Sequence, residues 1–88
     1  MARFHFHIHE NGRCIADEEG QEFADEALVR KEAVATGASI ARDAFITGTA
    51  RRVIVDVHRE RAPFMKVSIS LDVEDQAGGL LTPPHPKK

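Results

Sequence analysis

The run FHFHIH at residues 4–9, followed by Asn11-Gly12, constrains the fold of this chain more than any other feature. Strict alternation of apolar and polar residues is typical of a strand with one buried face, because successive side chains of a strand point to opposite sides. An Asn-Gly pair favours a tight hairpin turn, since both central residues of that turn need positive φ. The sequence therefore predicts antiparallel strands over about residues 3–9 and 13–16. Their inner face would carry Phe4, Phe6 and Ile8, and their outer face His5, His7 and His9.

A long helix is predicted over residues 26–47. Asp25 is a favourable N-cap, and Gly48 stands where a left-handed residue commonly ends a helix. Between them, apolar residues recur at helical spacing and form a stripe of mostly small side chains. A glycine within that stripe costs about 1 kcal/mol relative to alanine, which close packing on a sheet would offset. The stripe consists of Val29, Ala33, Gly37, Ile40 and Ala44, widened by Val34, Ala41 and Phe45.

After residue 48 the apolar period changes to two. Residues 53–57 and 65–73 each alternate apolar with polar side chains, and the segment 59–63 between them contains a proline. This pattern predicts a second hairpin. Pairing Val57 with Met65, and therefore Val55 with Val67, would place the valines on one face.

The predicted fold class is α+β. The order is ββαββ, with a four-stranded antiparallel sheet and one long helix packed on one face. Residues 1–75 would form a single domain. Residues 76–88 are rich in glycine and proline and have no periodicity, so they are predicted to form a flexible C-terminal tail.

Size and composition exclude several classes of protein. The 88 residues allow one modest core. No apolar run approaches the ~20 residues of a membrane span, and no signal-peptide pattern is recognised, so a cytoplasmic protein that contacts no membrane is expected. A single cysteine, Cys14, agrees with a reducing compartment. The net charge of −2 argues against a general affinity for nucleic acid.

No catalytic template fits the sequence. The glycines match neither a dinucleotide fingerprint nor a P-loop, and the serines lack a nucleophile-elbow context. The acidic run Asp17-Glu18-Glu19 lacks the spaced oxygen ligands of a calcium loop and is interpreted as a turn that faces water. We therefore expect a non-enzymatic protein.

The first hairpin offers a metal-site hypothesis. A turn centred on residues 11–12 places His9 directly opposite Cys14, with His7 diagonally beside them. Two imidazoles and a thiolate suit a zinc-like ion, with a fourth position left for water or another ligand. The alternative is that the histidines are simply solvated, in which case the protein needs no cofactor. The candidate metal ligands are His7, His9 and Cys14.

The layout resembles a family of short bacterial proteins of unknown function. Its members typically begin with an Arg-aromatic-aromatic-His strand and carry a D-x-E-G-x-E segment. Here the corresponding stretches are RFHFHI at residues 3–8 and DEEGQEF at residues 17–23, before the alanine-rich helix. The strands VIVDV at 53–57 and VSISL at 67–71 fit as well. The resemblance implies the fold and a bacterial cytoplasmic origin, but no activity.

The arrangement is also similar, as a fold analogy, to the partial ribonuclease-H-like domain of HicB-type antitoxins. This likeness implies an antitoxin-like or nucleic-acid-associated alternative. However, the chain has no tyrosine or tryptophan on which bases would stack, and its basic residues form no continuous stripe.

The main hypothesis is a small interaction or regulatory module. A sheet of four strands leaves two edges, and a small core gains stability when an edge or an apolar flank joins a second copy. We therefore expect a homodimer, with an unidentified protein partner as the alternative. The candidate interface is the helix flank formed by Val34, Ala38, Ala41 and Phe45.

Overall fold

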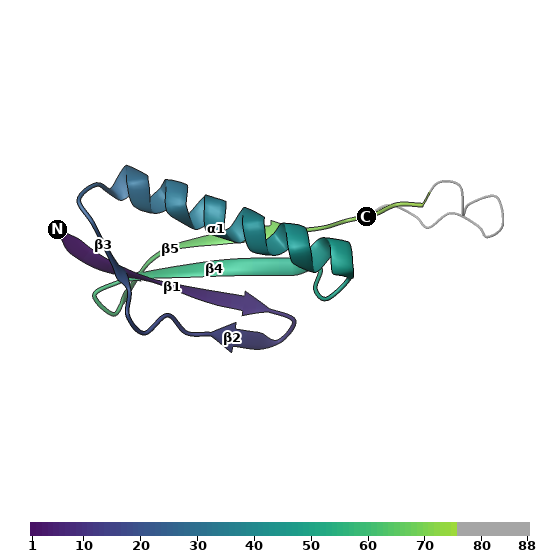
Figure 1. Cartoon of the computed structure of the whole chain (residues 1–88), viewed down its shortest axis with the longest axis horizontal. Helices are drawn as coiled ribbons and strands as arrows, with labels where there is room; N and C mark the ends of the chain where they lie inside the picture. Colours follow the sequence, from purple (N-terminus) through teal and green to yellow (C-terminus); the bar gives the residue numbers. More distant parts are fainter. Residues whose placement is uncertain (76–88) are drawn as a thin grey trace.

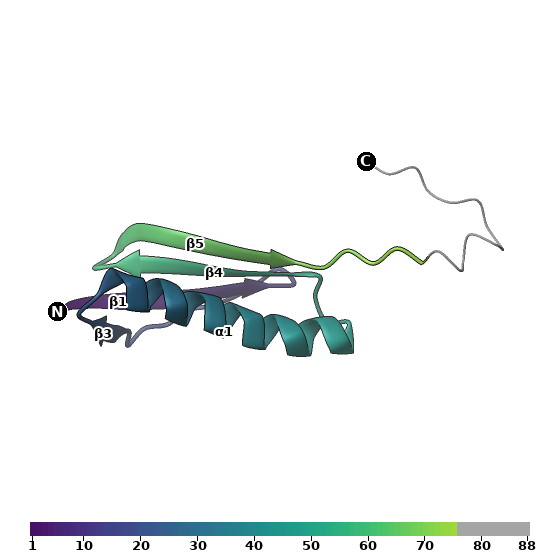
Figure 2. The ribbon, with the colours of Figure 1, turned by 90° about the horizontal axis from the view of Figure 1, so that it is seen from above.

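The computed structural model describes residues 1–75 (Figure 1). The tail predicted at residues 76–88 lies outside the described residues. One helix lies on one face of an antiparallel sheet, as the sequence predicts (Figures 1 and 2). In chain order the elements are β1 (Ala2–Glu10), β2 (Arg13–Ile15), β3 (Gln21–Phe23), α1 (Glu26–Thr47), β4 (Arg52–Arg59) and β5 (Ala62–Ser70).

The sheet has β1 and β4 at its centre. β5 forms one edge, and the other side of β1 is shared by two short strands, β2 beside its end and β3 beside its start. The predicted registers are confirmed, with Val57 opposite Met65 and His9 opposite Cys14. Strand β3 was not predicted, because three residues are too few to show an alternation.

The two hairpin turns differ from each other. Asn11 and Gly12 both have positive φ, as the Asn-Gly pair predicts. The second turn was expected over residues 59–63, but the strands run closer and leave only Glu60 and Arg61 between them. Both of these residues also have positive φ, at 49° and 74°. Residues with a Cβ rarely adopt this conformation, so Glu60 and Arg61 carry no local signal for so tight a turn.

The helix begins and ends at the predicted residues. The Asp25 carboxylate accepts a hydrogen bond from the Ala27 N–H at 2.8 Å, and Gly48 closes the helix with φ 78°. A Cβ on Gly37 would lie 3.0 Å from the Ile69 side chain and 3.1 Å from that of Val55. The glycine therefore lets the helix approach β4 and β5 closely, as its position in the small-residue stripe predicts.

The core lies between the helix and the central strands. Val53, Val55 and Val57 of β4 are fully buried beneath the helix. Phe4 of β1 is buried at one end, where its ring meets the rings of Phe23 and Phe64 edge-on at centroid distances of 5.9 and 5.1 Å. No helix among residues 1–75 is both long and apolar enough to cross a membrane.

Candidate functional site: a histidine face

Four histidines of the described residues 1–75 lie on the sheet face opposite the helix. Three come from β1, and His58 joins them from β4 because the register places it opposite His5. Residues that oppose each other in antiparallel strands point to the same face. The rings of His5 and His7 stack nearly parallel at 6.3 Å, and those of His7 and His58 meet edge-on at 4.9 Å.

Asp56 supplies a negative charge to this face. Its Oδ1 lies 3.6 Å from His58 Nε2, and its Oδ2 lies 3.9 Å from His9 Nε2. The register also places Asp56 opposite Lys66. However, the Asp56 carboxylate approaches the rings of His9 and His58, and the ion pairs among residues 1–75 do not include Lys66.

The segment after β2 folds back over the histidines and is held by Asp17. One carboxylate oxygen of Asp17 accepts the Phe6 N–H and the other accepts the Gly20 N–H, both at 3.0 Å. The Asp17 backbone N–H donates to His7 Nδ1 at 3.1 Å, which assigns the Nε2–H tautomer to neutral His7. Gly20 lies so close to His5 that a Cβ there would be 2.8 Å from Nε2.

The interpretation of residues 17–19 as a water-facing turn is therefore wrong for Asp17, which is half-buried, although Glu18 and Glu19 are exposed. Burial alone would raise the pKa of Asp17. The N–H groups of Phe6 and Gly20, the nearby His5 ring and the Glu19 N–H outweigh burial and hold the pKa of Asp17 below its ordinary value of 3.8.

The structure brings together two of the three predicted metal ligands. Cys14 Sγ lies 3.8 Å from His9 Nε2, in the predicted register. His7 instead accepts the Asp17 N–H and packs against His58. Within residues 1–75, no group of three or more His, Cys, Asp and Glu side chains is arranged to hold a metal ion.

The structure exposes only part of the predicted interface on the helix flank. Val34 is 47% exposed and Ala38 is exposed, while Phe45 is half-buried. Ala41 is buried in the core, because its position on the helix turns it toward the sheet. The flank that a partner would meet is therefore formed by Val34, Ala38 and Phe45.

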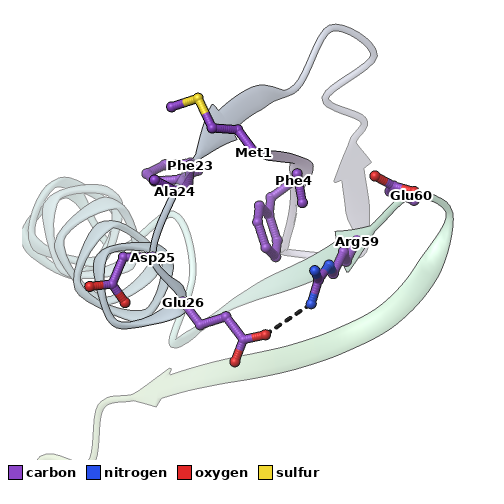
Figure 3. Close-up of a pocket in the computed structure, with 9 residues that line it drawn as sticks. Met1, Phe4, Phe23, Ala24, Asp25, Glu26, Arg59 and Glu60 are labelled. Carbon is purple, nitrogen blue, oxygen red and sulfur yellow. Dashed lines mark hydrogen bonds and ion pairs between the residues drawn. The ribbon is translucent and has the colours of Figure 1, made fainter.

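A shallow pocket of about 350 Å³ opens where β1, β3 and the start of the helix meet (Figure 3). Arg59 lies at its rim. Its guanidinium donates to Glu26 Oε2 at 2.9 Å and lies 5.6 Å from the centre of the Phe4 ring. The Arg59 guanidinium is paired with Glu26 and lies over the Phe4 ring, so the Arg59 side chain covers this end of the core. We assign the pocket no ligand.

The sequence matches a family described as a domain of unknown function (DUF6894) over residues 3–70. The chain belongs to this family. The match confirms the resemblance to an uncharacterised domain family, and no curated protein and no solved structure matches the chain. The fold analogy to HicB-type antitoxin domains stays a prediction.

Sequence reasoning missed three residues of the histidine face. His58 and Asp56 belong to it because the structure pairs β1 with β4, and no short-range signal gives the order of strands between two hairpins. Asp17 belongs to it because its segment returns to β1 as β3. A signal for this return was present in Gly20, which has φ +75° and contacts β1 where a side chain would not fit.

Proposed function

We propose that this domain is a bacterial, cytoplasmic, non-enzymatic interaction module that associates with a second copy of itself. The observation that carries the proposal is the open edge of β5. This strand has nine residues and pairs within residues 1–75 only with β4. Its outer backbone groups therefore remain available to another strand.

The apolar side of β5 is incompletely covered. Met65, Val67 and Ile69 pack against the core but stay half-buried, whereas the β4 residues opposite them are fully buried. The helix therefore covers β4 well and β5 only partly. A second copy at this edge would bury the remaining apolar area, which is worth roughly 25 cal/mol per Å².

The small core gives a physical reason for association. Among residues 1–75, four of the ten buried hydrophobic residues are alanines, which contribute little apolar area each. The buried alanines are Ala33, Ala41, Ala44 and Ala50. Domains of this size often need a further source of stability, and joining a second copy is a common one. The cytoplasmic part of the proposal is supported by the free, exposed thiol of Cys14, which suits a reducing compartment.

Native mass spectrometry of the tag-free protein tests the proposal. We expect a dimer at micromolar concentration, with a monomer appearing on dilution. Light scattering after size exclusion at several concentrations provides an independent measure of mass. A monomer at every concentration up to about 100 µM would overturn the proposal, since a contact weaker than this corresponds to less than about 5.5 kcal/mol.

Zinc binding is the second candidate function, supported by the 3.8 Å separation of Cys14 Sγ and His9 Nε2. Thiolate and imidazole are the ligands that Zn²⁺ prefers in proteins. Mass spectrometry with added zinc tests it. One ion per chain should bind, and the double variant H9A/C14A should not bind it. Uptake that is unchanged in this variant removes both residues as ligands, and the variant H5A is a matched control on the same strand.

A further inference from the structure

We propose that the dimer forms by antiparallel pairing of β5 and the residues 71–73 that follow it with the same segment of a second copy, about a two-fold axis at Ile69. In this arrangement Lys66 faces the partner's Asp72. The inference rests on the proposed function and specifies its surface and register.

The backbone limits the registers that are available. The Leu71 N–H donates to the Arg51 carbonyl at 2.9 Å, so Leu71 directs its hydrogen-bonding groups toward β4. These groups alternate in direction along an antiparallel strand. The even-numbered residues Lys66, Ser68 and Ser70 therefore direct theirs outward, away from β4. We call the contact between the two copies of this strand the seam. Across it, an outward-directed residue of one copy must lie opposite an outward-directed residue of the other.

A two-fold seam therefore has its axis at a residue. The centre of β5 is Lys66, where an axis would place two lysines opposite each other, so we compare the next three positions toward the end of the strand, Val67, Ser68 and Ile69. An axis at Val67 places Lys66 opposite the partner's Ser68. An axis at Ser68 places it opposite the partner's Ser70. Of these three axes, only the one at Ile69 gives Lys66 a partner of opposite charge, the partner's Asp72. Each dimer would form this pair twice, and opposite charges across strands stabilise a sheet.

The apolar side favours the same register. An axis at Ile69 places Ile69 against its own copy, Val67 against the partner's Leu71, and Met65 against the partner's Val73. Val73 is 66% exposed, and Ile69 and Val67 are half-buried. In Figures 1 and 2, the chain after β5 continues in the direction of the strand beyond the end of the sheet, where a second copy would meet it.

The charge pair also explains how this edge would select its partner. A lysine on an edge strand normally discourages pairing, because its charge would be buried against another strand. The ion pairs among residues 1–75 include neither Lys66 nor Asp72. The proposed seam places the two opposite charges together. Lys66 would therefore discourage pairing with other strands and permit pairing with this one.

A charge-exchange experiment tests the register. In the homodimer of K66E, and likewise of D72K, each seam places like charges opposite each other, and we expect the Kd to rise about tenfold. Mixing the two variants restores opposite charges at both positions. Native mass spectrometry should then show a heterodimer well above the half expected for random exchange. A mixture of K66E with S70K is the matched control, since it would assort selectively only with an axis at Ser68.

Single cysteines provide a measurement that does not depend on charge. A residue on the axis faces its own copy and can form a disulfide when introduced as cysteine. In a C14S background, I69C should cross-link the dimer under mild oxidation, while V67C and S68C should not. A cross-link at either control position places the axis there and overturns the Ile69 register.

The outcomes separate this inference from the proposed function. A wild-type chain that is monomeric contradicts both. A wild-type dimer that dissociates in V34D, but shows neither the heterodimer preference nor the I69C cross-link, places the interface on the helix flank. In that case the self-association stands and the β5 seam is wrong. Association of the edge only with a strand of a different protein would appear as a monomer in all of these experiments.

Discussion

The two edges of the sheet differ in how their outer backbone groups are covered. On the side of β1, the chain covers its own edge with β2, β3 and the segment between them. Midway between the two short strands, the Asp17 carboxylate accepts the outward-directed Phe6 N–H. On the side of β5, the edge is left without a strand of the same chain within residues 1–75.

The difference shows what an edge needs in order to be closed. On the outer side of β1, where neither β2 nor β3 pairs with Phe6, Asp17 supplies the acceptor for the Phe6 N–H and so substitutes for a strand. No such substitute contacts the outer groups of β5 among the described residues, and its apolar side is also partly exposed. One edge is therefore built to be closed, and we infer that the other is built to pair.

Removing Asp17 should have the largest effect, because it opens the closed edge. D17A leaves the half-buried N–H groups of Phe6 and Gly20 without their acceptor. Each lost acceptor costs about 1–3 kcal/mol, so we expect the free energy of unfolding to fall by about 3 kcal/mol. Urea denaturation measures this change. E18A, at an exposed neighbour, should change stability by less than about 0.5 kcal/mol, and an equally small change in D17A would show that Asp17 does not hold this edge.

Blocking the open edge should weaken association and leave the fold intact. In S68P, proline removes an N–H that points away from β4, so the pairing of β4 with β5 is retained. We expect the dimer Kd to rise at least tenfold, or about 1.4 kcal/mol, while the far-UV circular dichroism is unchanged. S68T keeps the donor and should dimerise normally. A dimer that is equally strong in S68P would exclude the β5 edge.

Low pH should destabilise the edge of β1 that Asp17 covers, and it should leave the β5 edge unaffected. The pKa of Asp17 is lowered in the folded protein, so its charged form stabilises the native state. This contribution is complete above the unfolded value near 3.8 and is lost as the pH falls through the lower folded value. The stability difference between the wild type and D17N should therefore be constant from pH 7 to about pH 5 and shrink below about pH 4. A difference that does not change down to pH 2 would contradict the role of the Asp17 charge.

The local signals in the sequence predicted the closed edge only in part. Alternation, capping residues and the Asn-Gly turn placed β1, β2 and the helix, since each depends on neighbours in the chain. The cover formed by Asp17 depends on contacts between residues 17–20 and β1, which local patterns do not report. For the same reason His9 and Cys14 were predicted together, being joined by one short turn, whereas His58 reached the histidine face only through the pairing of β1 with β4.

Changing the turn before β5, formed by Glu60 and Arg61, should have the smallest effect on stability. It also allows a direct comparison with the turn of the first hairpin. Asn11-Gly12 and Glu60-Arg61 both have positive φ at two successive residues, but only the first pair suits that conformation. The double variant E60N/R61G should therefore stabilise the fold, by about 1 kcal/mol. Thermal unfolding should show a higher Tm, and the reverse exchange N11E/G12R should lower it. Because neither turn lies on the β5 edge, the dimer Kd should stay the same in both variants. A loss of dimer in E60N/R61G would mean that the second turn, and not only the open strand, contacts the second copy.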